Sequence, residues 1–111
     1  MQNKSIDNII NHSDLLKILA NSKLRYKKAI LEKADKNFII SICDIIFNLL
    51  QGNVNLTDKE KTELKKHKSF LRKIVKKSSL KEKKKIIIQK GGGVLSIILP
   101  AVFSTIASLL T

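Results

Sequence analysis

The amino-acid sequence predicts an all-α protein: a small module of about five helices, a glycine hinge and an apolar C-terminal helix. Apolar side chains recur at helical spacing along most of the 111 residues, and no strand-like alternation persists. Residues that commonly cap helices also precede several of the apolar runs. The length suits one domain, and because only 5% of the residues are aromatic, its core must depend on Ile and Leu.

The first two predicted helices are short. Residues 1–12 are polar and are expected to form a flexible N-terminus. Ser13 or Asp14 is predicted to cap a helix that runs to about residue 20 and packs through its leucines. Ser22 is the expected N-cap of a second helix, to about residue 33, with a basic face formed by Lys23, Arg25, Lys27 and Lys28.

The third predicted helix, residues 36–51, is strongly hydrophobic. Asp35 is a suitable N-cap, and Gly52 is typical of the residue just beyond a helix C-terminus. On a helical wheel, apolar side chains cover most of the circumference, and the remaining polar strip consists of Ser41, Asp44, Asn48 and Gln51. The pattern therefore predicts either the central helix of the core or a helix at an interface.

Two capping signals mark the next helices. Thr57 and Glu60 fit a capping box at the start of a helix that runs to about Lys77. Ser79 and Glu82 repeat the pattern at the start of a helix that ends near residue 90. Each helix has an apolar side and a side crowded with lysine, so both are predicted to be amphipathic and basic.

Positive charge is concentrated in these two helices. The chain has a net charge of +13, and residues 57–90 contain 14 cations and 4 anions, which gives +10 for this segment. This density indicates a polyanionic partner, either DNA or an anionic membrane. Because lysine dominates and aromatic residues are not interleaved, we expect sequence-independent contact with DNA phosphates. The cations predicted to contact DNA are Lys65, Lys66, Arg72, Lys73, Lys76, Lys77, Lys81, Lys84 and Lys85.

The C-terminal segment, residues 94–111, contains no charged side chain and follows Gly91, Gly92 and Gly93, which are predicted to form a hinge or a processing site. One face of the segment is strongly apolar, and the other carries small and hydroxyl side chains. The apolar face is predicted to dock on a membrane, a capsid protein or another partner. A last core helix, packed on the helix at 36–51, is the alternative. The predicted docking residues are Leu95, Ile98, Leu99, Val102, Phe103, Ile106, Leu109 and Leu110.

No catalytic or metal-binding pattern is recognisable in the sequence. His12, Cys43 and His67 lack the spacing of metal ligands, and no nucleophile is paired with a base. Cys43 and His67 are expected to be packed side chains. The sequence therefore predicts a non-enzymatic protein without a cofactor.

The order of the segments resembles a known group of proteins. The basic runs at 64–68, 71–73 and 79–85, then Gln89-Lys90-Gly91-Gly92-Gly93 and an apolar tail, are similar to a small virion protein of Maverick/Polinton-type elements and adintoviruses. From about residue 81, the pattern also resembles the core protein X precursor of adenoviruses. In that family a viral cysteine protease cuts at the glycine pair and prefers Met, Ile or Leu where this chain has Gln89.

The resemblance implies a minor virion or core protein that is packaged with the genome. It implies a location in the virion, and in the host nucleus or cytoplasm during assembly. Such a protein would bind DNA and dock through its apolar tail on a capsid protein or an anionic membrane. The residues themselves leave two alternatives: a membrane-active cationic protein with a lytic or pore-forming tail, and a helical interaction module that assembles into a homo-oligomer.

Overall fold

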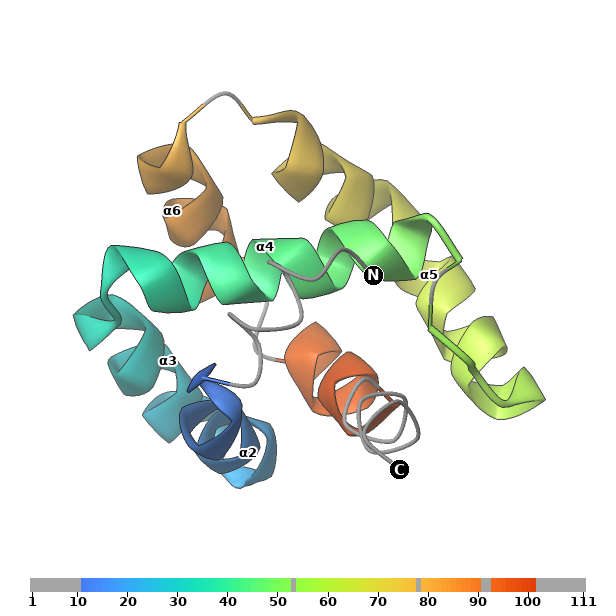
Figure 1. Cartoon of the computed structure of the whole chain (residues 1–111), viewed down its shortest axis with the longest axis horizontal. Helices are drawn as coiled ribbons and strands as arrows, with labels where there is room; N and C mark the ends of the chain where they lie inside the picture. The colour runs from blue at the N-terminus through green and yellow to red at the C-terminus, as the bar shows by residue number, and fades with distance from the viewer. Residues whose placement is uncertain (1–10, 53, 78, 91–92, 102–111) are drawn as a thin grey trace.

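The computed structural model describes residues 11–52, 54–77, 79–90 and 93–101, and the regular elements within these ranges are all helices. The predicted all-α class is therefore confirmed. Figure 1 shows α4 crossing the middle of the view, with α2 and α3 toward one end and α5 toward the other. Residues 93–101 are also helical. The labelled helices are α2 (Ser13–Asn21), α3 (Leu24–Lys33), α4 (Lys36–Leu50), α5 (Asp58–Lys76) and α6 (Leu80–Lys90).

The helix α4 forms the centre of the hydrophobic core. Its side chains Phe38, Ile42 and Ile45 are buried, and the helix contacts both α5 and α6. Buried side chains from the other helices, including residues 93–101, join them in one cluster. Of the two possibilities that the sequence left open, core and interface, α4 belongs to the core.

Two residues of the polar strip of α4 are buried, whereas an apolar side chain is exposed. Ser41 is fully buried and its hydroxyl donates to the carbonyl of Asn37 at 3.1 Å. Asn48 is also buried, and its amide donates to the carbonyl of Asp44 at 2.8 Å. Because these bonds satisfy the polar groups within the helix, burial is tolerated there. Phe47, in contrast, remains 47% exposed.

Three helix starts and one helix end lie as the capping signals predicted. The Asp35 carboxylate accepts from the Phe38 backbone N–H at 2.8 Å. Thr57 and Glu60 form both bonds of a capping box, and the Ser79 hydroxyl accepts from a backbone N–H in α6. Gly52 follows α4 with a φ of +78°, the left-handed conformation that ends helices and favours glycine.

The predicted caps of α2 and α3 are wrong. The N-cap of α2 is His12 rather than Ser13 or Asp14, and it makes no side-chain capping bond. Ser22 belongs to the C-terminal end of α2, where its hydroxyl donates to a backbone carbonyl, and Lys23 is the N-cap of α3. A hydroxyl between two helices can bond either one, so sequence alone did not fix its role.

Two side chains in the N-terminal third of the chain make more tertiary contacts than the sequence predicted. His12 was assigned to a flexible segment, yet its Nδ1 lies 3.0 Å from the Ser41 hydroxyl and its ring contacts Phe38. Lys27 was assigned to a basic surface, yet it is buried and its ammonium donates to the Ser22 carbonyl at 2.6 Å. The rest of the predicted flexible segment, residues 1–10, lies outside the described residues.

The helical residues 93–101 pack into the core. Val94, Leu95, Ile98 and Leu99 are at most 5% exposed and belong to the same cluster as the α4 side chains. Gly93, at the start of the segment, is exposed. For residues 93–101, this arrangement corresponds to the alternative of a last core helix. The predicted docking residues Val102, Phe103, Ile106, Leu109 and Leu110, with Gly91 and Gly92 of the proposed hinge, lie outside the described residues.

Candidate nucleic-acid interface

The helix α5 carries a continuous row of cations along one face. The row consists of residues spaced at four, three, four and four positions, which places them within about 80° of the helix circumference. From its first to its last residue the row is about 22 Å long, comparable to about six base pairs of duplex DNA. We call it the α5 basic stripe, and its members are Lys61, Lys65, Lys68, Arg72 and Lys76.

The α5 basic stripe lies beside the C-terminal end of α4. Lys61, Lys65 and Lys68 line a hollow of about 420 Å³ together with Leu50 and residues of the loop after α4. Arg72 and Lys76 line a second hollow of about 470 Å³, in which Leu50 takes part again. The two hollows are therefore neighbours, and the stripe forms the cationic border of a surface shared by α4 and α5.

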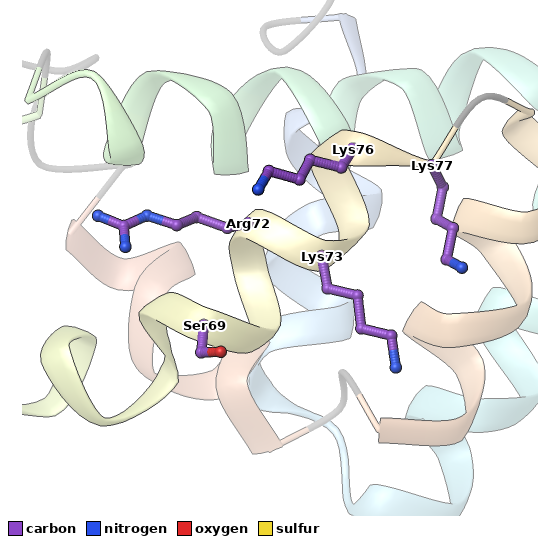
Figure 2. Close-up of a pocket in the computed structure, with 5 residues that line it drawn as sticks. All are labelled: Ser69, Arg72, Lys73, Lys76 and Lys77. Carbon is purple, nitrogen blue, oxygen red and sulfur yellow. The ribbon is translucent and has the colours of Figure 1, made fainter.

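The last turns of α5 gather further cations. Arg72, Lys73, Lys76 and Lys77, with Ser69, line a hollow of about 500 Å³, which we call the α5 terminal hollow. Figure 2 shows Arg72 and Lys76 extending to one side of the helix, whereas Lys73 and Lys77 extend to another. Cations at this end are favourable for folding as well, because the C-terminus of a helix carries partial negative charge.

Few carboxylates oppose these cations. The three acidic residues of α5, Asp58, Glu60 and Glu63, all precede Leu64. Within α5 and α6 one ion pair forms, between the Lys66 ammonium and Glu63 at 3.1 Å. In the part of the chain that the structure describes, the remaining lysines and arginine of these two helices pair with no carboxylate, so the exposed ones can meet a phosphate-bearing partner.

The nine cations predicted from the sequence have different roles in the structure. Arg72, Lys73, Lys76 and Lys77 come together in the α5 terminal hollow, and Lys65 belongs to the stripe. Lys66 is engaged by Glu63. Lys84 is partly buried, and its ammonium donates to the carbonyl of Ala34 at 2.9 Å, which ties α6 to the corner between α3 and α4. Lys81 and Lys85 are exposed on α6.

Sequence reasoning missed two members of the stripe, Lys61 and Lys68. Both were visible in the sequence as residues on the same helical face as Arg72, but the prediction emphasised the most densely charged run. Lys61 is exposed and Lys68 is partly exposed, and both line the hollow beside the loop after α4. The helical register of Lys61 and Lys68 relative to Arg72 is the signal in the sequence that would have identified them.

The thiol of Cys43, on α4, is half-buried against the core. Burial raises the pKa of Cys43 from its ordinary value of 9.0 to about 11, partly opposed by Lys83 and reinforced by Asp44. At a pH near 8 the folded protein therefore has about a hundredfold less thiolate than the unfolded chain.

We expect iodoacetamide to alkylate Cys43 about a hundredfold more slowly in the folded protein than in urea, because the thiolate is the reactive species. Mass spectrometry follows the reaction directly, since the chain has one cysteine. Equal alkylation rates in the two states would contradict the raised pKa of this thiol.

The same pKa shift makes stability depend on pH. The folded thiol keeps its proton above the pH at which the unfolded thiol loses it. The free energy of unfolding should therefore fall as pH rises from about 9 toward 11.

The structure also bears on the predicted docking residues, on membrane spans and on metal sites. Leu95, Ile98 and Leu99, three of the predicted docking residues, are buried in the core. Among the described residues, no helix is long and apolar enough to cross a membrane. Within the same ranges, no three His, Cys, Asp or Glu side chains come together as a metal site.

Comparison with known proteins adds no family assignment. No protein-family model, no curated protein and no solved structure matches this chain. The functional interpretation therefore depends on the positions and charges of the side chains described above.

Proposed function

We propose that this protein binds nucleic acid without sequence selectivity, through phosphate contacts made by the α5 basic stripe and the α5 terminal hollow. The observation that carries the proposal is the row of five cations along one face of α5, none of them paired with a carboxylate of the described residues. Lysine ammonium groups contact phosphate oxygens as point charges and do not discriminate between bases. Lys81 and Lys85 extend the positive surface onto α6.

The biological setting that we propose is a virion or core particle. Support comes from the order of the segments, in which an Ile-rich helix and basic helices precede three glycines and an apolar tail. Binding to the packaged genome would use the cations of α5, most of which are exposed with residues 93–101 packed in the core. Docking on a capsid protein or an anionic membrane through Leu95, Ile98 and Leu99 additionally requires the helix at 93–101 to leave the core.

The proposal is tested by titrating the protein against two unrelated DNA duplexes over a range of salt concentrations. If each of the seven cations of the stripe and the terminal hollow contacts one phosphate, log K should fall with log salt with a slope of about −6.3 for both sequences. The slope arises because each neutralised phosphate releases its condensed counterion. Strong preference for one sequence, or an affinity that does not change with salt concentration, would contradict the phosphate mechanism.

A further inference from the structure

An exposed aromatic side chain from α4 lies next to the cations of α5. Phe47 is 47% exposed although it belongs to the most buried helix of the protein. It borders the second hollow, of about 470 Å³, where cationic and apolar side chains meet. The lining residues are Phe47, Leu50, Gln51, Arg72, Val75 and Lys76. In the sequence Phe47 and Arg72 are 25 positions apart, so the aromatic and basic residues become neighbours only through folding.

The Phe47 ring is available for stacking. Among the described residues, no aromatic ring or cation stacks on it. Tyr26, which is 50% exposed on α3, differs in this respect. The Arg25 guanidinium lies 4.8 Å from the centre of the Tyr26 ring and also donates to its hydroxyl at 2.9 Å. Among the described residues, Phe47 is therefore an aromatic surface that no side chain stacks on, beside two cations, whereas a neighbouring side chain covers one face of Tyr26.

Single-stranded nucleic acid fits this arrangement. Proteins that bind single strands combine a cationic groove that follows the backbone with aromatic side chains on which bases stack. In a duplex the base faces are covered by neighbouring base pairs, so a side chain of this kind finds no free face there. Arg72 and Lys76 supply the charge at this hollow, and the Gln51 amide adds hydrogen-bonding groups for a base edge.

We propose that the second hollow, lined by Phe47, Arg72 and Lys76, binds single-stranded nucleic acid, with one base stacked on Phe47 and adjacent phosphates held by the two cations. This inference rests on the proposed phosphate binding and deepens it. The α5 basic stripe holds either form of nucleic acid through its backbone, and Phe47 adds affinity for an unpaired strand alone.

Two substitutions test the role of Phe47. The Phe47→Leu variant keeps an apolar side chain but loses the aromatic ring, and Tyr26→Leu is the matched control because Tyr26 is equally exposed and lies outside the hollow. Binding of each protein is measured by fluorescence anisotropy with a labelled pyrimidine DNA strand, an RNA strand of the same sequence and length, and the corresponding DNA duplex.

Phe47→Leu should weaken binding to single strands about fivefold or more and change duplex binding by less than about twofold. Its salt slope should equal that of the unmodified protein, since no phosphate contact is removed. Tyr26→Leu should change neither affinity. Whichever strand, DNA or RNA, loses more affinity in the Phe47→Leu variant identifies the preferred ligand.

A third variant gives a spectroscopic readout. The chain contains no tryptophan, so Phe47→Trp introduces a single indole at the hollow. Stacking of a base on the indole should quench its fluorescence with single strands and leave it nearly unchanged with the duplex. Unquenched fluorescence, together with unaltered strand affinity in Phe47→Leu, would overturn the inference while leaving the phosphate mechanism in place. Failure to bind either form would overturn both.

Discussion

Replacing Leu99 with alanine is expected to lower the free energy of unfolding by about 2–5 kcal/mol, the usual cost of a cavity at a buried leucine. Leu99 is fully buried and belongs to the core cluster that surrounds α4. A loss of this size is a large fraction of the total stability of a small domain. Urea denaturation followed by circular dichroism measures it.

The control for this substitution lies in the same helix. Gly93 is exposed, and a methyl group added there meets nothing within 4 Å, so Gly93→Ala should leave stability unchanged or raise it by up to about 1 kcal/mol. If Leu99→Ala also cost less than about 0.5 kcal/mol, the C-terminal helix would not be part of the core. An independent tail, free to dock on a capsid or a membrane, would then be the better interpretation.

The second large effect is expected from removing the cations of the α5 terminal hollow. A variant with Arg72→Gln, Lys73→Gln, Lys76→Gln and Lys77→Gln should bind DNA at least about a hundredfold more weakly at about 0.1 M salt. Up to four phosphate contacts are lost, and each contributes through counterion release. Because Lys73 and Lys76 also lie in the last turn of α5, thermal unfolding should be checked in parallel.

A matched control separates placement from total charge. The exposed lysines Lys28, Lys33, Lys36 and Lys59 lie outside the α5 basic stripe and the terminal hollow. Replacing these four with glutamine removes the same charge, from +13 to +9, but leaves the proposed interface intact. The control variant should retain most of the affinity, since long-range attraction is screened beyond about 10 Å at moderate salt. Equal losses in both variants would mean that net charge, not the α5 surface, governs binding.

Local signals predicted local structure well. Asp35, Thr57 and Ser79 cap their helices because a short polar side chain at the first turn satisfies backbone N–H groups that no other group reaches. Gly52 ends α4 because the left-handed conformation suits glycine. In each case the determining interaction spans at most a few residues, so it can be recognised in the sequence.

Burial of particular side chains was harder to predict. The wheel of α4 predicted either a core helix or an interface helix, and it did not show which side would remain open. The structure buries Ser41 and Asn48 and exposes Phe47, because packing of several helices decides where the last open strip lies. Lys27 is buried because its ammonium reaches a carbonyl across the α2–α3 corner, a contact that no helical pattern reveals.

The candidate site was predicted in part. The cations of α5 were identified from their density, and helical register placed the stripe. The aromatic component was missed because Phe47 lies in a different, strongly apolar helix, where the sequence pattern indicated core. Only the packing of α4 against α5 brings Phe47 to the same hollow as Arg72 and Lys76.

The salt dependence of DNA binding in the two fourfold variants tests the phosphate mechanism most directly. Relative to the unmodified protein, the terminal-hollow variant should have a slope of log K against log salt that is shallower by up to about 3.6, at about 0.9 for each lost phosphate contact. The variant lacking Lys28, Lys33, Lys36 and Lys59 should keep the original slope. Identical slopes in all three proteins would contradict the assignment of phosphate contacts to the last turns of α5.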